Sequence, residues 1–393
     1  MNKDVIVLNC GSSSVKFAII NAETGDAGLS GIAESLGNQD ASLSFKIDGQ
    51  KTTVALPENA GHTEALNAIQ SVIAQTGVNP VAIGHRVVHG GEKFKQAALV
   101  DESVLRAIEE YASMAPLHNM ANLKGITTAQ GAYPNLPHVA VFDTSFFQTM
   151  PKKAYVYALP MSLYKEHGIR RYGFHGTSHK FILDTTAATL NKPVTDTSII
   201  SAHLGNGCSV SAIEKGQAVD TSLGFTPLEG LVMGTRCGDL DASLPGTLQQ
   251  KLGKTADEIN DLLNKQSGLL GISELSNDCR TLEEAALNGH EGALLAIEIF
   301  CYRLAKYISG YMIAVPSLDA IVFTGGIGEN SSLIRETTMG YFKHFGVAID
   351  EKKNLDARFG NAGEISASLS NTKVLVVPTN EEWVIAAQAA DFA

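Results

Sequence analysis

Three segments of this chain combine glycine with polar side chains directly after hydrophobic runs, a pattern suited to holding phosphate. The first, Asn9–Lys16, reads NCGSSSVK. Its glycine lets backbone N–H groups approach an anion closely, and three serines and one lysine add donors. Asn9 is placed to reach a metal ion or a phosphate. An ordinary hairpin with polar turn residues is the alternative, but such a serine run after a strand is unusual.

The other two segments are His203–Ser209 (HLGNGCS) and Thr324–Asn330 (TGGIGEN). The Asn-Gly pair of His203–Ser209 is also typical of a β-hairpin. This segment is therefore weak evidence for phosphate binding by itself and becomes a plausible second phosphate contact only together with Asn9–Lys16. The third lies between a predicted strand and a predicted helix, an order that suits a nucleotide site. The chain has no Gly-x-Gly-x-x-Gly motif here, and its Gly253-Lys254-Thr255 lacks the earlier glycine of a Walker A motif. Dinucleotide enzymes and P-loop NTPases are therefore disfavoured.

Arginine and histidine lie in three further glycine-rich segments, which are Gly84–Gly91, Arg171–His179 and Gly234–Asp239. A guanidinium group binds carboxylates and phosphoryl oxygens through paired donors, so three such segments favour an anion site over unrelated surface arginines. His85/His89 and His175/His179 have the i,i+4 spacing of zinc ligands on a helix. The flanking glycines and the lack of a His-Glu-x-x-His motif argue against zinc.

Two carboxylates follow hydrophobic strands. Asp143 comes after 138–142, and Glu381 comes shortly after 373–377. Ligands of open α/β sheets bind at this edge. The structural alternatives are a turn for Asp143 and a favourable helix N-terminal charge for Glu381.

Strand and helix patterns alternate along the chain, which predicts an α/β fold. The strands are expected at 5–8, 15–20, 138–142, 199–202, 209–213, 320–323 and 373–377. Helical periodicity marks 63–75 and 101–114. Residues 292–315 are apolar around most of a helix and predict a buried one, and a final helix is expected at 381–390. Thr255-x-x-Glu258 and Thr281-x-x-Glu284 have the form of capping boxes. Residues 6–16 and 200–210 both read as strand, turn, strand. This echo suggests two related domains, although chance similarity is an alternative, with a boundary near 148–152.

The composition argues against disordered, nucleic-acid-binding, membrane-spanning and exported proteins. The 393 residues are 44% hydrophobic and 18% charged, which excludes disorder. The net charge of −11 argues against a nucleic-acid surface. No hydrophobic run approaches a membrane helix, and the N-terminal run is too short for a signal peptide. Five widely spaced cysteines suit a reducing compartment, so we expect a soluble cytoplasmic protein.

Taken in order, these segments resemble the acetate kinase family over essentially the whole chain. The order and spacing match without departure at Asn9–Lys16, Arg86–Gly91, Ala115–Asn119, Phe142–Thr144, Arg171–His179, His203–Gly207, Arg236, Gly325–Asn330 and Asn380–Glu382. The resemblance implies a duplicated ribonuclease-H-like fold, shared with sugar kinases, actin and heat-shock chaperone ATPases. It implies an N-terminal domain of residues 1–148 plus 382–393 and a C-terminal nucleotide-binding domain of 149–381, which close over nucleotide in a cleft. It also implies a homodimer.

The implied reaction is the reversible transfer of the γ-phosphoryl group of ATP to acetate, with Mg²⁺ or Mn²⁺, giving acetyl phosphate and ADP. By position, the resemblance implies metal binding by Asn9 and Glu381, and catalytic roles for Asp143, His175 and Arg236. It implies substrate binding by Arg86, Val88, Leu117, Phe174 and Pro227. The implied ATP contacts are Ser12, Ser14, Lys16, His203, Leu204, Gly205, Asn206, Gly207, Asp278, Cys279, Arg280, Gly326, Ile327, Gly328, Glu329 and Asn330.

The chemistry of the residues agrees with this reaction. A carboxylate nucleophile is ionised at pH 7, so it needs no general base, and phosphoryl transfer depends mainly on positioning and charge stabilisation. Asp143 would then orient the metal or a charged partner. The alternatives are a propionate or butyrate kinase, since one methylene changes discrimination by only about 1–3 kcal/mol, a nonenzymatic actin-like ATP-binding module, and a zinc hydrolase. The direction of the reaction in the cell, the nucleotide base and any regulation stay open.

Overall fold

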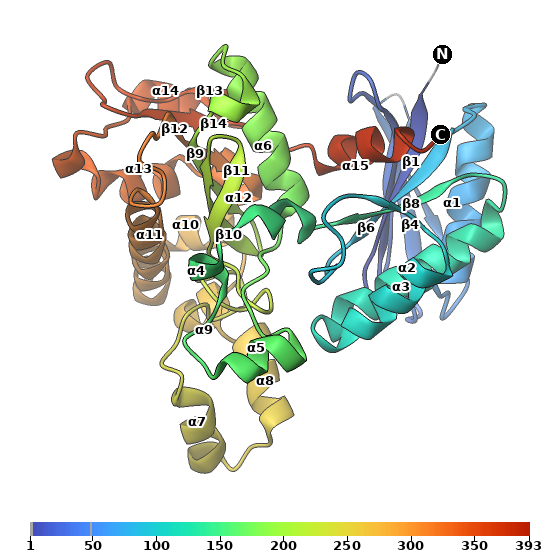
Figure 1. Cartoon of the computed structure of the whole chain (residues 1–393), viewed down its shortest axis with the longest axis horizontal. Coiled ribbons are helices and arrows are strands. Elements are labelled where there is room, and N and C mark those ends of the chain that lie inside the picture. The colour runs from blue at the N-terminus through green and yellow to red at the C-terminus, as the bar shows by residue number, and fades with distance from the viewer. Residues whose placement is uncertain (1–2, 48) are drawn as a thin grey trace. The chain divides into compact units, whose positions relative to one another are not determined.

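The computed structural model describes residues 3–47 and 49–393, without the side chains of Ser113, Pro116 and Leu117. The chain folds into two compact units. The first contains Met1–Gln148, Gly176–Ser178 and Asn380–Ala393, and the second contains Thr149–His175 and His179–Thr379. Each unit is built on one β-sheet (Figure 1). The predicted α/β fold is confirmed.

The sheet of the first unit has the strand order β5-β4-β3-β2-β1-β6-β8-β7. β1 is parallel to β6, and β6 is parallel to β8, whereas the other neighbouring pairs are antiparallel. The strands are β1 (Asp4–Cys10), β2 (Val15–Asn21), β3 (Ala27–Glu34), β4 (Ser42–Ile47), β5 (Gln50–Ala55), β6 (Ala82–Val87), β7 (Ala98–Leu99) and β8 (His138–Phe142).

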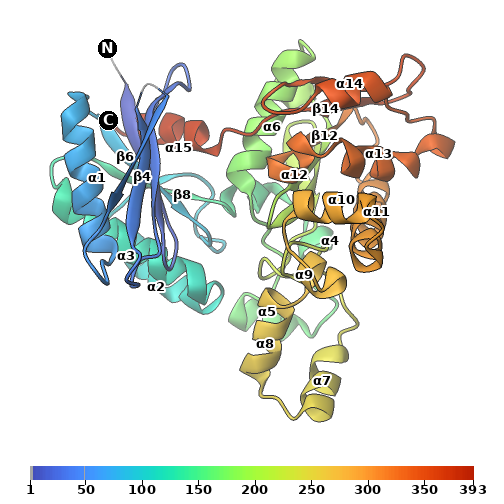
Figure 2. The ribbon, with the colours of Figure 1, turned by 180° about the vertical axis from the view of Figure 1, so that it is seen from behind.

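Both faces of this sheet are covered, which is why β1 reads as a continuous hydrophobic run. Ile6 and Leu8 pack in one core cluster with residues of α1 (His62–Thr76) and α3 (Pro116–Ala132). Val5 and Val7 pack in a second cluster with residues of α15 (Glu381–Ala390). Figures 1 and 2 show α1 and α15 on opposite sides of these strands. The chain up to Thr149 also contains the α-helix α2 (Glu102–Glu110) and the short 3-10 helices η1 (Tyr111–Ser113) and η2 (Ser145–Thr149).

The sheet of the second unit has the order β11-β10-β9-β12-β14-β13. Its strands are β9 (Ile199–Leu204), β10 (Cys208–Glu214), β11 (Gln217–Thr221), β12 (Ala320–Thr324), β13 (Gly363–Glu364) and β14 (Lys373–Val376). The longer helices with residues in this unit are α6 (Gly176–Thr189), α7 (Leu244–Leu252), α8 (Ala256–Lys265), α10 (Cys279–Leu287), α11 (Glu291–Tyr311) and α13 (Ser332–Gly340). The shorter ones are α4 (Lys152–Tyr155), α5 (Met161–His167), η3 (Val194–Asp196), α9 (Gly268–Ser273), α12 (Gly325–Asn330), η4 (Lys343–Phe345) and α14 (Glu351–Asp356).

The two sheets repeat one topology. The order β3-β2-β1-β6-β8 in the first unit corresponds to β11-β10-β9-β12-β14 in the second. The strand directions correspond as well, with two antiparallel pairs followed by two parallel pairs. The sequence echo between 6–16 and 200–210 therefore marks equivalent hairpins, and the prediction of two related halves is confirmed.

Most predicted elements are present, with shifts at their ends. The capping box at Thr255 is confirmed, with Glu258 bonded back to the Thr255 amide. The box predicted at Thr281 is wrong, because α10 starts earlier, at Cys279, where Asp278 accepts hydrogen bonds from the Arg280 and Thr281 amides. The helix predicted over 292–315 ends at Tyr311, in line with a proline at 316, which disfavours helical backbone before it. No helix in the described part of the chain is long and apolar enough to cross a membrane.

Candidate active site

A buried ion pair lies at the carboxyl ends of two adjacent strands in the first unit. Arg86, on β6, donates from Nε to Asp143 Oδ1 at 3.0 Å and from Nη2 to Asp143 Oδ2 at 2.8 Å. Asp143 follows β8, which runs parallel to β6, so the sheet itself brings the two side chains together. The Asp143 side chain is only 1% exposed, and that of Arg86 is 20% exposed. This paired geometry fixes the plane of the guanidinium group.

Glu381 is a second carboxylate beside Arg86. Its Oε2 lies 3.8 Å from Arg86 Nε and accepts a hydrogen bond from Thr177 Oγ1 at 3.1 Å. Burial alone would lower the pKa of Arg86, but the charges of Asp143 and then Glu381 outweigh it and raise that pKa. The two neighbouring carboxylates therefore favour the charged form of Arg86.

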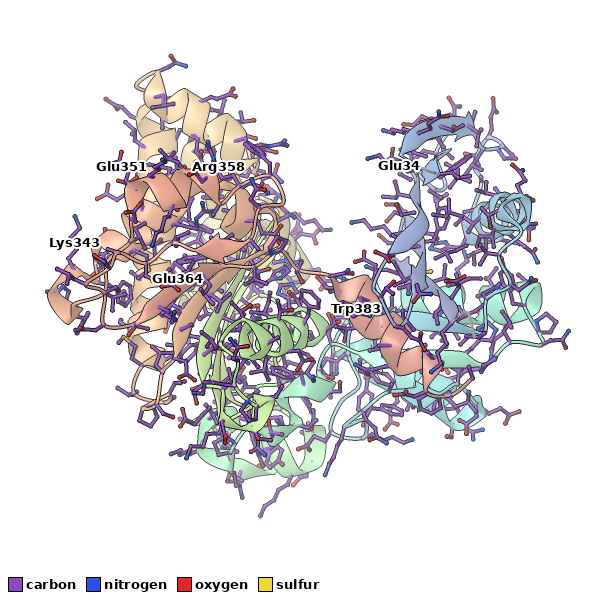
Figure 3. The ribbon with its side chains drawn as sticks, turned by 90° about the horizontal axis from the view of Figure 1, so that it is seen from above. Glu34, Lys343, Glu351, Arg358, Glu364 and Trp383 are labelled. Carbon is purple, nitrogen blue, oxygen red and sulfur yellow. The ribbon has the colours of Figure 1, made fainter. Side chains whose placement is uncertain are left out.

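The start of α15 holds Glu381 in place. Asn380 is the N-cap of this helix, and its Oδ1 accepts from the Trp383 amide at 3.0 Å. The Trp383 indole, labelled in Figure 3, donates to the Ala22 carbonyl at 3.0 Å, just past the end of β2. The helix that carries Glu381 is thus capped by Asn380 and tied to the end of β2 by Trp383 in its first turn.

The serine segment forms the predicted hairpin between β1 and β2. The Gly11 amide donates to the Ser14 carbonyl at 2.8 Å, and His62 Nε2 lies 2.8 Å from the Gly11 carbonyl oxygen. Asn9 and Lys16 are directly paired across the two strands. Both line a pocket of about 430 Å³ together with Asn380 and Glu382, so the polar end of β1 and the start of α15 share one cavity.

Asn122 links this hairpin to the segment after β6. Its Nδ2 donates to the Cys10 carbonyl at 2.8 Å, and its Oδ1 accepts from the Val88 amide at 3.1 Å. Val88 itself is only 9% exposed. The structure therefore brings Arg86 and Val88 near the end of β1. The side chain of Leu117, predicted to join Val88 in a methyl pocket, lies outside the described residues.

The segment Gly176–Ser178 is held in the first unit by hydrogen bonds to Asp143 and Glu381. The Gly176 amide donates to the Asp143 carbonyl at 3.1 Å, and Thr177 binds Glu381 as described above. A Cβ at position 176 would collide with that Asp143 carbonyl oxygen. Only glycine allows so close an approach. Neither this glycine nor Thr177 was singled out by the sequence, because their partners lie 33 and 204 residues away.

In the second unit, His175 and Arg236 lie around the turn between β9 and β10. The position that a Cβ would take on Gly207 is 3.4 Å from Arg236 Nη1 and 3.5 Å from His175 Nε2. Arg236 Nη1 also donates to the Pro227 carbonyl at 3.0 Å. Four predicted residues, from segments far apart in the sequence, thus meet at one place. Phe174, predicted beside them, is 2% exposed.

Arg236 differs from Arg86 in its electrostatic surroundings. No carboxylate of a described residue forms an ion pair with it, and its described partners are a carbonyl and the Met233 thioether. Burial lowers its pKa accordingly, because the charge has lost water without gaining a counter-ion. A buried cation of this kind favours the arrival of an anion.

The predicted nucleotide segments lie in the second unit, and their polar groups are partly engaged. In the β9–β10 turn, the Gly234 amide donates to the Asn206 carbonyl at 3.0 Å, and Asn277 Nδ2 donates to Asn206 Oδ1 at 3.0 Å. This brings the turn next to the segment that leads into Asp278, Cys279 and Arg280. Leu204 is buried at the end of β9.

The segment after β12 is not an open loop. α12 begins at Gly325 itself, with Thr324 as its N-cap. Glu329 Oε1 accepts from the Gly325 amide at 2.8 Å and from the Thr379 amide at 3.0 Å. Glu329 therefore closes the start of its own helix, whereas Gly326, Ile327, Gly328 and Asn330 form its remaining turns.

The histidine pairs considered for zinc have other partners. His85 Nε2 lies 2.9 Å from His138 Nδ1, and burial, followed by the charge of His138, lowers the pKa of His85 to about 3. His175 and His179 both contact the Ser209 hydroxyl. His85 is on a strand, so the His85/His89 pair does not have the helical spacing that the zinc hypothesis assumes.

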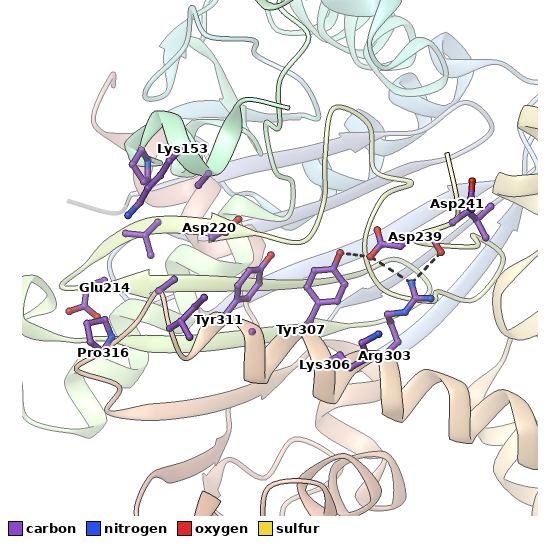
Figure 4. Close-up of a pocket in the computed structure, with 17 residues that line it drawn as sticks. Lys153, Glu214, Asp220, Asp239, Asp241, Arg303, Lys306, Tyr307, Tyr311 and Pro316 are labelled. Atoms are coloured by element: carbon purple, nitrogen blue, oxygen red, sulfur yellow. Dashed lines mark hydrogen bonds and ion pairs between the residues drawn. The ribbon is translucent and has the colours of Figure 1, made fainter. Parts of the chain in front are cut away.

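A larger pocket of about 1130 Å³ lies elsewhere in the second unit (Figure 4). Tyr307 Oη donates to Asp239 Oδ2 at 2.6 Å, and Arg303 Nη1 lies 3.7 Å from the same oxygen. None of the predicted site residues lines it. Its size therefore does not make it the candidate active site.

Comparisons with known proteins agree on one family. A family model described as the acetokinase family matches residues 4–387. An acetate kinase of Shewanella sp. (strain W3-18-1) is 56% identical, over 98% of this chain and 97% of the relative. An acetate kinase of Shewanella pealeana is 57% identical, over 99% of each chain.

Solved structures give the same picture. A propionate kinase from Francisella tularensis has a TM-score of 0.95 and 43% identity, with 99% of each chain covered. An acetate kinase from Porphyromonas gingivalis has a TM-score of 0.92 and 42% identity, with 98% of each chain covered.

Proposed function

Because the chain belongs to the acetokinase family, we propose that it transfers the γ-phosphoryl group of ATP to acetate, reversibly, giving acetyl phosphate and ADP. The observation that carries this proposal is the partly buried Arg86, held by Asp143 two residues before the buried, apolar Val88. The described contacts of Arg86 use Nε and Nη2, which leaves the donors of Nη1 for a small carboxylate. Leu117, Phe174 and Pro227 stay predictions as further residues that bind the acid.

We propose that Asp143 acts by orienting Arg86. Acetate is already ionised at pH 7 and needs no base, and both carboxylate oxygens of Asp143 are engaged by the guanidinium group. One acetate oxygen attacks the γ-phosphorus in line, while the bond from that phosphorus to the β–γ bridging oxygen breaks and ADP leaves. Two anions must approach each other in this step, so fixed cations lower its barrier.

Arg236 and His175 are the proposed groups that stabilise the transferring phosphoryl group. Arg236 is a buried cation without a described carboxylate partner, which suits a site where negative charge arrives with the substrate. His175 Nε2 lies on the same side of the β9–β10 turn. The proposed nucleotide contacts are the residues of the serine hairpin, the β9–β10 turn, Asp278–Arg280 and Gly326–Asn330 named above.

Asn9 and Glu381 would hold Mg²⁺, or Mn²⁺ in its place. Their amide and carboxylate oxygens are the hard donors that Mg²⁺ prefers, and Mg²⁺ is commonly bound by one or two protein oxygens together with substrate phosphates. The described residues contain no group of three or more His, Cys, Asp or Glu that could hold a metal, which is consistent with a site completed by nucleotide. When bound, the metal supplies charge neutralisation on the phosphates.

We further propose a homodimer and a cytoplasmic location, and we retain the domain boundaries at 148 and 381 as predictions. The exposed Leu294, Leu295 and Tyr302 on α11 support a subunit contact on that helix. The odd number of widely spaced cysteines supports the location.

A propionate kinase is the second candidate function, because a structure of that name is 43% identical to this chain. The test of both is acyl-phosphate formation with MgATP, trapped by hydroxylamine, with acetate, propionate, butyrate or no acid. Product that falls steeply from acetate to butyrate is the expected result. Higher turnover with propionate would assign the second function. If folded protein that binds ATP gave no acid-dependent product, the kinase proposal would be wrong and an actin-like ATP-binding module would remain.

A further inference from the structure

A chain of hydrogen bonds runs from His175 into the core of the second unit. His175 Nδ1 lies 2.9 Å from Ser209 Oγ, and the same oxygen lies 2.8 Å from His179 Nε2. The other ring nitrogen of His179, Nδ1, lies 3.0 Å from Ser201 Oγ. His179, Ser201 and Ser209 are all fully buried. The chain therefore links a half-buried imidazole to groups that water does not reach.

Three elements fix this geometry. His175 is the N-cap of α6, with a left-handed backbone (φ +60°), and His179 lies one turn further along that helix. Ser201 is on β9 and Ser209 is on the neighbouring β10. The His203 ring, also on β9, lies 4.4 Å from that of His175 between centroids. The Ser209 hydroxyl is thus held between two imidazoles by a helix and two neighbouring strands.

The hydroxyl has one hydrogen, so its two histidine contacts cannot both receive it. Burial, followed by the charge of His203, holds the pKa of His179 well below its ordinary value, so His179 is neutral with a single N–H. In one arrangement the donors all point outward, from Ser201 to His179 Nδ1, from His179 Nε2 to Ser209, and from Ser209 to His175 Nδ1. In the other arrangement every donor is reversed.

The outward arrangement determines which nitrogen of neutral His175 carries its proton. Nδ1 accepts from Ser209, so the hydrogen must be on Nε2, the nitrogen near Gly207 and Arg236. A protonated His175 also keeps a hydrogen on Nε2, and its Nδ1 then donates to Ser209 in the reversed arrangement. Nε2 is therefore a donor toward the proposed phosphoryl position in the outward arrangement and in protonated His175, whereas a neutral His175 in the reversed arrangement would leave Nε2 an acceptor.

We propose that Ser209 and His179 are positioning residues that keep His175 Nε2 protonated for phosphoryl transfer. This inference rests on the role proposed above for His175. It assigns a function to two fully buried side chains that are not among the proposed substrate contacts.

The kinetic test compares Ser209→Ala with Ser211→Ala. Ser211 is also fully buried on β10, but its hydroxyl contacts Thr221 instead of a histidine. We expect Ser209→Ala to lower kcat by about ten- to hundredfold, as loss of an orienting partner does, with KM for ATP and acetate little changed. Ser211→Ala should keep the wild-type kcat. In a His175→Ala background, Ser209→Ala should not lower kcat any further.

The tautomer is measured directly by ¹⁵N NMR of histidine-labelled protein, with the His175 signals identified by their loss in His175→Ala. Wild-type protein should show Nε2 protonated and Nδ1 accepting, Ser211→Ala should match it, and Ser209→Ala should show a mixture of tautomers.

Two results would overturn the proposal. One is a wild-type neutral His175 protonated on Nδ1, which needs no variant and so holds even if Ser209→Ala does not fold. The other is the same kcat loss from Ser209→Ala with and without His175. If His175→Ala itself keeps full kcat, the catalytic role proposed for His175 fails, and the tautomer measurement still decides whether the hydrogen-bond chain exists.

Discussion

The role proposed for Asp143 is one in which a buried residue serves catalysis without moving a proton. Its two oxygens hold Arg86, and Glu381 supplies the second negative charge. The Arg86 guanidinium group is therefore oriented, and its charge is compensated, before substrate arrives. Charge stabilisation requires this kind of preorganisation.

Asp143→Asn tests this role. The variant keeps the size of the side chain but loses one acceptor and the charge, so we expect kcat to fall by about 10²-fold or more, comparable to the loss of an oxyanion contact. Steady-state kinetics at several Mg²⁺ concentrations measure the effect. Near-native turnover with unchanged Mg²⁺ dependence would show that Asp143 orients neither Arg86 nor the metal.

Arg236→Ala tests the cation of the second unit. If Arg236 stabilises the transferring phosphoryl group, kcat should fall by about 10³-fold or more, as in enzymes that lose an arginine finger. The exposed Arg106, on α2, is the control, and Arg106→Ala should have no effect. A change confined to KM would instead make Arg236 a ground-state binder.

Val88→Ala tests the acid pocket. Removing two methyl groups should shift kcat/KM toward propionate or butyrate relative to acetate by about 10-fold, within the 1–3 kcal/mol that a methylene contributes. Val87→Ala is the matched control, because Val87 packs in the core cluster with Phe94 and Phe142. That variant should lose stability without changing the ratio. If Val88→Ala left the ratio of kcat/KM values between the acids unchanged, Val88 would not line the acid pocket.

At the scale of elements, two adjacent glycines in the strand-to-helix turn after β12 have different roles. Gly325 has φ +77°, and a Cβ there would lie 2.7 Å from the Leu204 carbonyl oxygen. Gly326 has no atom within 4 Å of its Cβ position and an ordinary backbone. The first glycine is therefore needed for the turn, and the second is not.

We accordingly expect Gly325→Ala to lower the free energy of unfolding by about 1–3 kcal/mol, the cost of a strained left-handed residue. Gly326→Ala should be neutral or slightly stabilising, because it lies in a helix. Denaturant unfolding of both variants measures the difference. Equal stability of the two would show that the turn relaxes around the added carbon.

Elements with an uninterrupted hydrophobic pattern were predictable from the sequence. The strand 138–142 and the helix 381–390 match to the residue. β6 was missed because His85 and Arg86 interrupt its hydrophobic run, and both are accommodated only by distant partners, His138 and Asp143. β5 was missed because all of its residues are exposed and give no buried face to detect. β4 was missed although Leu43, Phe45 and Ile47 alternate along it and pack in the core.

The same reason limits prediction of the site. Motifs located the segments, since glycine, serine and arginine cluster locally. Asn122 lies outside the predicted motifs, and Thr177 lies within the predicted segment Arg171–His179 but was not itself assigned a role. Both owe their roles to contacts made across 112 and 204 residues. Such partners become visible only when the sheet order is known.

For the whole molecule, buried histidines make stability depend on pH. Burial lowers the pKa values of His85, to about 3, and of His138 and His179. These groups stay neutral in the fold but take up protons in the unfolded chain below about pH 6.5. The stability they contribute is therefore complete above that pH and is lost as pH falls toward their folded-state values.

We expect the free energy of unfolding at pH 5 to be lower than at pH 7, by up to about 2 kcal/mol for each of these histidines. Denaturant titrations at pH 7, 6 and 5 measure it. His167→Gln, at the exposed end of α5, should leave the pH dependence unchanged. Equal stability at pH 7 and pH 5 would mean that the buried histidines already gain protons in the fold.

The packing of α15 also sets an order of events during synthesis. Ile385, Ala386 and Ala389 complete the core cluster that contains Val5 and Val7 of β1. The ribosome makes these three residues only after all of residues 149–379, so the first unit begins to emerge first but acquires its full core last. Glu381 arrives on the same helix. A nascent chain released early therefore lacks both part of its core and one carboxylate beside Arg86.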